Sequence, residues 1–337
     1  MKLSVLIPVY NERYLVGELV RRVLCAALPA GMEREVVIVD DGSSDGTREL
    51  LAKIAQENPD SIRYIEHEKN QGKGAAIRTA SAAATGEYSI FQDADLEYDP
   101  TDYAKLLGPL LKGHADVVYG SRFLSSERRR VLYFWHSLGN TALTMLSNMF
   151  TDLNLTDMET GYKAFRTSIL KTIPIRCRGF GIEPEITAKI AKRGLRIYEV
   201  PISYDGRTYR EGKKITWKDG VRALLVIIKY RLVDDLYDEK SGHEILASMS
   251  KAYRFNRWMA DAVVRPHLGH KVLEIGAGLG NMTLQLLPRD KYIASEYDSL
   301  HLEVLNTLKT HHHTLETAQI DAQNAADFEQ IKESVDT

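Results

Sequence analysis

VVIVDDGSSDGT, residues 36–47, begins with four β-branched residues, continues through an acidic loop that contains glycine, and ends in a helix-start signal. The apolar residues 36–39 are typical of a strand buried on both faces, and the Asp-Gly-Thr at 45–47 is typical of a helix start. The same order recurs through the first 120 residues. Strands are predicted at 3–9, 36–39, 62–66, 88–91 and 117–119, and helices at 18–28, 47–56, 75–84 and 102–111. This alternation predicts an α/β fold with a mostly parallel sheet and helices on both faces.

Polar residues follow every one of these strands, at the edge where ligands bind in open parallel sheets. A single such loop could be a plain helix cap, but five together indicate a binding site. The candidates, in chain order, are Pro8, Tyr10, Asn11 and Glu12; Asp40, Asp41 and Gly42; Lys73 and Gly74; Asp93, Ala94, Asp95 and Glu97; and Arg122.

Asp93 and Asp95 form an acidic pair at the end of the fourth strand. Two carboxylates one residue apart can hold a hard divalent cation and leave coordination positions open for phosphate oxygens. Lys73, between two glycines, could place a point charge on a diphosphate where the backbone can come close. The alternatives are that Asp95 or Glu97 only caps the next helix and that Lys73 is a solvated loop lysine.

Seven motifs carry a resemblance to a known family. In order, they are IPVYNE (7–12), VDDGSSDGT (39–47), NQGKGAA (70–76), QDADLEYDP (92–100), GSRF (120–123), DMETGYKAF (157–165) and VPISYDGRTYREGKKITWKDG (200–220). Together they resemble the GT-A nucleotide-sugar glycosyltransferases of family 2, most closely the dolichyl-phosphate and undecaprenyl-phosphate hexose synthases. The resemblance covers residues 1–233, which we expect to be one GT-A domain that includes its acceptor and interface helices.

The resemblance implies roles for the donor-side residues. Asp93 and Asp95, with Glu97 as a third ligand, would bind Mg²⁺ or Mn²⁺. Asp40 would bind the nucleobase, and the loop at 8–12 would lie on base and ribose, while Asp41 and Gly42 shape the turn. Because a carboxylate can accept from either uracil or guanine, the donor is expected to be a UDP- or GDP-hexose. Glu183 and Glu185 lie where the family often has an acid in the sugar pocket, and a helix-start role is the alternative.

The acceptor side depends on Asp157 and on several basic residues. Asp157 would be the general base if the acceptor were a hydroxyl, whereas a phosphate is already anionic near neutral pH and needs no strong base. The expected acceptor is polyprenyl phosphate, and arginine suits it because guanidinium binds phosphate oxygens in bidentate fashion. The candidate phosphate-binding residues are Arg122, Arg130, Arg207, Lys213 and Lys214, of which Arg122 and Arg207 are also candidate catalytic residues.

Basic residues beside aromatic ones indicate contact with an anionic membrane surface. Three arginines at 128–130 precede Tyr133, Phe134 and Trp135, and residues 205–231 hold eight Lys and Arg against three Asp and Glu. Packing of these helices on their own domain is the alternative. No apolar stretch reaches the ~20 residues that span a bilayer, and the first residues lack a signal-peptide pattern. A cytoplasmic protein, peripheral at the cytoplasmic face of the membrane, is therefore expected.

A second unit is predicted at 251–337, after a linker at 234–250. KVLEIGAGLGN (271–281) is a strand that leads into a glycine-rich turn, and a second strand ends 20 residues after Gly276 at Glu296. Glycines let a nucleoside approach the backbone, and an acid at this spacing can bind ribose hydroxyls. The pattern resembles a partial Rossmann-like class I S-adenosylmethionine-dependent methyltransferase domain, which would bind that cofactor only if it were complete. The residues concerned are Glu274, Gly276, Gly278, Gly280, Glu296 and Asp321.

Composition narrows the class of protein. The 337 residues are 44% hydrophobic and 27% charged, as in ordinary globular chains. The two cysteines form no CxxC pair or metal spacing. The expected enzyme is a metal-dependent inverting glycosyltransferase; alternatives are transfer to a glycan or small-molecule hydroxyl, a methyltransferase with a sugar-nucleotide-binding domain, and a binding module without activity. No nucleic-acid partner is expected, and a homo-oligomer is left open.

Overall fold

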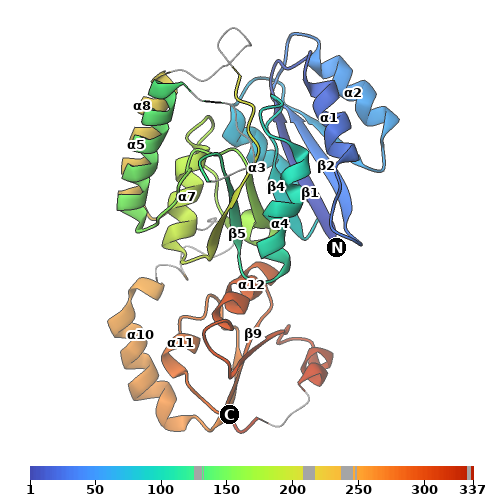
Figure 1. The fold of residues 1–337 in the computed structure, drawn as a ribbon. Coiled ribbons are helices and arrows are strands. Elements are labelled where there is room, and N and C mark those ends of the chain that lie inside the picture. Colours follow the sequence, from blue (N-terminus) through green and yellow to red (C-terminus); the bar gives the residue numbers. More distant parts are fainter. Residues whose placement is uncertain (125–130, 132, 208–216, 237–245, 247–248, 332–334) are drawn as a thin grey trace. The chain divides into compact units, whose positions relative to one another are not determined.

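The chain forms two compact units, residues 1–235 and residues 236–337. The structure is a computed structural model that describes residues 1–124, 131, 133–207, 217–236, 246, 249–331 and 335–337 (Figure 1). Within these described residues, each unit has its own sheet, of seven strands in the first and three in the second.

The sheet of the first unit has the strand order β3-β2-β1-β4-β6-β5-β7. Its strands are β1 (Lys2–Val9), β2 (Glu33–Asp40), β3 (Ile62–Glu66), β4 (Tyr88–Phe91), β5 (Val117–Ser121), β6 (Lys163–Arg166) and β7 (Ile197–Pro201). All neighbouring pairs are parallel except those of β6, which runs antiparallel between β4 and β5. The five predicted strands and the mostly parallel sheet are confirmed, whereas β6 and β7 are additions to the predicted elements.

Helices cover both faces of this sheet (Figure 1). Buried residues of α1 (Val16–Cys25), α2 (Thr47–Glu57) and α4 (Tyr103–Leu111) pack on one face. Those of α3 (Lys73–Ala83), α6 (Thr167–Thr172), α7 (Ile182–Lys192) and α8 (Trp217–Leu232) pack on the other. The strands interior to the sheet read as continuous apolar runs because both of their faces are buried.

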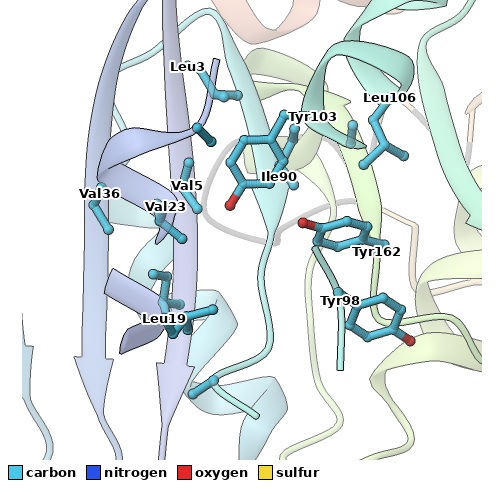
Figure 2. Close-up of a cluster of buried hydrophobic side chains, with 14 of the residues drawn as sticks. Leu3, Val5, Leu19, Val23, Val36, Ile90, Tyr98, Tyr103, Leu106 and Tyr162 are labelled. Carbon is cyan, nitrogen blue, oxygen red and sulfur yellow. The ribbon is translucent and has the colours of Figure 1, made fainter. Parts of the chain in front are cut away.

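A polar centre lies within the first of these cores. The rings of Tyr98 and Tyr162 stack at 4.8 Å, and Tyr103 lies 6.0 Å from Tyr162 (Figure 2). The hydroxyls of Tyr103 and Tyr162 both donate to Oε1 of Gln92, at 2.8 and 2.7 Å. Buried hydroxyls need such partners, and this cluster supports the segment directly after β4.

Two helices present apolar side chains to solvent. α5 (Phe134–Thr151) packs against α8, and the two are drawn side by side in Figure 1. The exposed apolar residues on them are Phe134, Trp135, Leu138, Met145, Met149, Val221, Leu224, Leu225, Ile228 and Leu232. Among the described residues, no helix combines the length and the apolar character that a membrane crossing requires.

The second unit is built on a parallel sheet in the order β10-β9-β8. Its elements are α10 (Tyr253–Met259), a π-helical turn (Ala260–Val264), a 3₁₀ turn (Arg265–His267), β8 (Lys271–Ile275), α11 (Thr283–Leu286), β9 (Lys291–Glu296), α12 (Ser299–Leu308), β10 (Leu315–Gln319) and a second 3₁₀ turn (Ala325–Gln330). The predicted strand, glycine turn and second strand are therefore present. Residues 336 and 337 add backbone hydrogen bonds to Lys271 and Leu273 of β8.

Candidate active site

The acidic segment after β4 lies beside two basic side chains. Nζ of Lys73 is 2.8 Å from Oδ1 of Asp93 and 2.9 Å from Oε1 of Glu183. Burial lowers the pKa of Lys73, but these two carboxylates outweigh it and hold the pKa above its ordinary value. The predicted alternative of a solvated loop lysine does not fit this placement, because the Lys73 side chain is 13% exposed.

Arg207 is surrounded by three carboxylates. Its Nη2 is 3.4 Å from Oε1 of Glu12 and 3.5 Å from Oδ2 of Asp95, and its Nε is 3.6 Å from Oε1 of Glu97. Its backbone N–H donates to Oε1 of Glu97 at 2.8 Å. The structure thus places Arg207, predicted to contact the acceptor phosphate, among the acidic side chains of the donor side.

These contacts provide a test of whether a divalent cation fits. Burial, together with the charges of Asp93 and Glu97, raises the pKa of Asp95 to about 7, although the charge of Arg207 lowers it. The carboxylates therefore outnumber the positive charges beside them, which a cation on Asp93 and Asp95 would relieve. Within the described ranges, no three His, Cys, Asp or Glu side chains form a group that could hold a metal ion by themselves.

The loops after β1 and β2 are joined where a nucleoside is predicted. The backbone N–H of Asn11 donates to Ser43, and its side-chain oxygen accepts from the N–H of Ser44. Asp40, fully buried, accepts through Oδ2 from Ser43 N–H and from Arg48, while its Oδ1 has no hydrogen-bond partner among the described groups. That free acceptor fits the predicted contact with a base N–H.

Other residues of the predicted nucleotide set have different surroundings. Pro8 lies within β1, Tyr10 is exposed, and Ala94 is buried between the two acidic residues. Asp41 accepts from His67 and from the backbone N–H groups of Gln71 and Gly72. Its carboxylate therefore shapes the turn that leads to Lys73, and a Cβ at Gly42 would be 2.6 Å from the backbone of this turn.

The glycines on both sides of Lys73 are predicted to let a phosphate come close to the backbone. In the structure they instead make room for the backbone of residues 177 and 178. A Cβ at Gly72 would lie 2.3 Å from the carbonyl oxygen of Arg178, and one at Gly74 would lie 2.0 Å from that of Cys177. The N–H groups of Gly74 and Ala75, at the start of α3, donate to the Arg178 carbonyl. The close approach is thus made by the protein's own backbone.

Asp157 and Arg122 form a buried pair on the predicted acceptor side. Nε and Nη2 of Arg122 contact the two carboxylate oxygens of Asp157 at 2.6 and 2.7 Å, and Arg122 N–H donates to Oδ2 at 3.1 Å. Asn140 of α5 donates to Oδ1 at 3.3 Å. Both oxygens of Asp157 are therefore engaged. Arg130, Lys213 and Lys214 lie outside the described residues.

Two charged residues that the sequence reasoning missed lie in the same region. Burial, aided by the charge of Glu183, raises the pKa of Glu159 to about 8, and burial lowers the pKa of Lys163 to about 8. Lys163 donates to the backbone carbonyls of Met158 and Thr160. The sequence signal that could have identified Lys163 is its position directly before the apolar residues Ala164 and Phe165. Glu185 is also buried, and it accepts from the backbone N–H groups of Arg176 and Cys177.

In the second unit the predicted acidic residues Glu274, Glu296 and Asp321 accept hydrogen bonds from nearby backbone N–H groups and side chains. Gly276, Gly278 and Gly280 have φ of 73°, 58° and 79°, a region that glycine adopts without strain. Glu296 accepts from the N–H of Gly278 at 2.8 Å. Glu274 accepts from Thr283 and Tyr292, and Asp321 from the N–H of Gln323.

Gly161 offers a sharp test of the Asp93 position. A Cβ there would lie 2.2 Å from Oδ2 of Asp93, so Gly161→Ala should push that carboxylate away from its place beside Lys73. We expect at least a tenfold loss in catalytic rate, since ångström-scale misplacement costs about 10²-fold. The added Cβ would also lie 3.1 Å from the ring of Tyr98, so melting curves separate a loss of stability from the loss of rate. The control is Gly108→Ala, whose Cβ meets nothing within 4 Å. Equal activity of both variants would contradict this role of Gly161.

Comparison with known proteins bears on the first unit. The family model described as Glycosyl transferase family 2 matches residues 4–173. Undecaprenyl-phosphate 4-deoxy-4-formamido-L-arabinose transferases of Salmonella paratyphi A and Salmonella dublin are 32% identical over 212 residues, which cover 63% of this chain and 62% of each relative. The chain thus spans less than two thirds of the length of these relatives.

Solved structures support the same fold. Glucosyl-3-phosphoglycerate synthase from Mycobacterium tuberculosis, crystallised with Mn²⁺, UDP and glucosyl-3-phosphoglycerate, aligns with a TM-score of 0.54 at 22% identity, covering 69% of this chain and 81% of that one. A crystal form of the same synthase with UDP alone gives 0.54 at 21% identity. The resemblance to methyltransferases stays a prediction, whereas the GT-A-like fold and the family 2 resemblance are confirmed. With half of its length matched by the family model, the chain belongs to glycosyl transferase family 2.

Proposed function

We propose that the first unit transfers a hexose from a UDP- or GDP-hexose to a polyprenyl phosphate, with inversion at the anomeric carbon. The observation that carries the proposal is the pair of Arg122 and Asp157. A hydroxyl acceptor needs a base that is free to take its proton, and both oxygens of Asp157 are bound to Arg122. A phosphate acceptor needs instead a guanidinium in a fixed orientation. Arg122 supplies the guanidinium, and Asp157 holds it in place.

The donor side supports a nucleoside diphosphate sugar. Asp93 and Asp95 would hold Mg²⁺ or Mn²⁺, which neutralises the leaving diphosphate when bound. Lys73 lies against Asp93 and adds a positive charge at the same place. Asp40 offers its unpartnered Oδ1 to the base, and Glu183 has a buried, unpartnered Oε2 for a sugar hydroxyl. The Mn²⁺ and UDP in the synthase crystals and the undecaprenyl-phosphate relatives agree with this assignment.

We further propose that α5 and α8 bring the site to an anionic membrane surface at the cytoplasmic face. Their exposed aromatic and aliphatic residues suit the interfacial layer of a bilayer. A cavity of about 450 Å³ between α5 and residues 153–156 has uncharged residues throughout its described lining, among them Thr156, next to Asp157 in the chain. Its lining combines apolar residues that would contact an isoprenoid tail, Met145, Met149, Leu153 and Leu155, with the polar residues Thr141, Thr144, Asn148, Asn154 and Thr156.

The experiment is a nucleotide-release assay. UDP- and GDP-hexoses are supplied with and without a short polyprenyl phosphate, in Mn²⁺ and in EDTA, and with a glycan hydroxyl acceptor in parallel. We expect release that depends on both the metal and the lipid phosphate. Nucleotide release with the hydroxyl acceptor but not with the lipid phosphate would favour sugar transfer to a glycan or small-molecule hydroxyl and contradict the proposal.

For the second unit we propose a partial methyltransferase-like domain without activity. Glu296 accepts backbone N–H groups through both oxygens, from Gly278, Tyr297 and Asp298. It is therefore poorly placed to bind ribose hydroxyls. We expect no methyl transfer and weak binding of S-adenosylmethionine in calorimetry. Measurable turnover with a labelled methyl group would show this expectation to be wrong.

A further inference from the structure

The guanidinium of Arg207 lies where a cation would neutralise the acidic cluster. It faces Glu12, Asp95 and Glu97 at 3.4 to 3.6 Å, and its side chain is 14% exposed. Three carboxylates converge on one positive charge, while Asp93 is already neutralised by Lys73 at 2.8 Å. The backbone of Arg207 is held separately, because its N–H donates to Glu97.

We propose that Arg207 is a positioning residue that takes the place of the divalent cation on Asp95 before the donor binds, and that it is released from Asp95 when the metal-bound donor enters. This inference rests on the proposed function. A guanidinium and a metal ion repel each other, and both would be held by the carboxylate of Asp95, whose Oδ2 lies 3.5 Å from Nη2 of Arg207. In the empty site Arg207 keeps the buried carboxylates together without the metal.

The released guanidinium remains close to the acceptor side. Tyr204 joins the two regions, since its hydroxyl donates to Oε2 of Glu97 at 2.6 Å and its ring lies 5.2 Å from the guanidinium carbon of Arg122. The backbone hydrogen bond to Glu97 keeps Arg207 anchored at this point. Loss of the Asp95 contact would therefore leave Arg207 held by Glu12 and Glu97 alone, with more of its charge available to an anionic acceptor.

The first test measures binding of Mn²⁺ to the full chain without nucleotide, from the electron paramagnetic resonance signal of free Mn²⁺. Arg207→Gln should bind Mn²⁺ at least threefold more tightly than the wild type, because the competing charge is gone, whereas Arg207→Lys should stay within twofold of the wild type. The control is Arg21→Gln, which changes the net charge equally at an exposed position of α1. Melting curves establish that each variant is folded.

A purely structural role predicts the opposite sign. If Arg207→Gln binds Mn²⁺ equally or more weakly while it is folded, the inference is wrong. Because this titration contains no sugar donor or acceptor, its outcome does not depend on which reaction the enzyme catalyses. A failed transfer assay beside tighter Mn²⁺ binding would overturn the proposed function and leave the role of Arg207 standing.

The second test addresses whether loss of the Asp95 contact makes Arg207 available to the acceptor phosphate. Affinity for a short-chain polyprenyl phosphate is measured with and without Mn²⁺ and UDP. We expect the wild type to bind the lipid phosphate at least fivefold more tightly when Mn²⁺ and UDP are present, and Arg207→Gln to lose this enhancement. An equal enhancement in both proteins, or none in the wild type, would overturn this part of the inference.

Discussion

Asp93→Asn and Asp95→Asn are each expected to lower the rate of sugar transfer on the order of 10³-fold, because a divalent cation contributes several kcal/mol to stabilising the departing diphosphate. The two side chains directly follow β4 and lie beside Lys73 and Arg207, respectively. Binding of the nucleotide sugar should weaken as well. Initial rates and donor affinity at saturating Mn²⁺ measure both effects.

The matched control for these variants is Asp60→Asn, which makes the same chemical change at an exposed position. It should leave rate and donor affinity unchanged. Melting temperatures of the three variants separate a loss of function from a loss of folding. Full activity of the Asp93 and Asp95 double variant in EDTA would refute a metal-dependent mechanism.

Arg122→Ala is expected to reduce transfer to a lipid phosphate more than Asp157→Asn does. Loss of a charge-assisted contact to the acceptor costs on the order of 2 kcal/mol, or about 30-fold in rate. Asp157→Asn keeps one oxygen that can accept from Arg122, so its effect should be smaller. If Asp157 were a general base, its loss would instead remove roughly 10²- to 10⁴-fold and abolish the pH dependence that the base provides.

The structure offers a closely matched control for this pair. Arg196 contacts both oxygens of Asp116 at 3.0 and 2.8 Å, and its N–H also donates to Asp116. Asp116 immediately precedes β5, whereas Arg122 immediately follows it. Arg196→Ala therefore shows how much stability and activity are lost when a similar Arg–Asp pair is removed away from the site. A strongly impaired Asp157→Asn beside a nearly normal Arg122→Ala, with no binding to anionic liposomes, would contradict the polyprenyl-phosphate acceptor.

Local signals in the sequence suffice for the alternating part of the fold and for the acidic pair. The apolar runs at 3–9 and 36–39 lie within the observed β1 and β2, and the residues after them meet at one edge because parallel strands end there. Asp93 and Asp95 are recognisable because a strand end fixes their place in the sheet. These features depend on residues that are close together in the sequence, so a local sequence pattern is enough to predict them.

Features that depend on distant contacts could not be predicted in the same way. β6 has four residues, and nothing local indicates that it inserts between β4 and β5. The contact of Gly74 with the Cys177 carbonyl joins residues about one hundred positions apart. Arg207 pairs with Glu12, 195 positions away, so its motif alone could not distinguish a phosphate contact from a carboxylate contact.

Because β6 runs antiparallel, the donor-side and acceptor-side residues of the site come from different kinds of chain segment. Donor residues leave parallel strands at their carboxyl ends, whereas Asp157 and Gly161 enter from the amino end of β6 and connect back to α5. Residues 134–162 therefore form one continuous segment, which is attached to the sheet through β6, through the contacts of Thr156 with Ser121 of β5 and Glu199 of β7, and through the pair of Asp157 and Arg122. Substitutions in this segment and at the end of β5, where Arg122 lies, can therefore change the proposed acceptor preference while β1, β2 and their loops retain the same nucleotide.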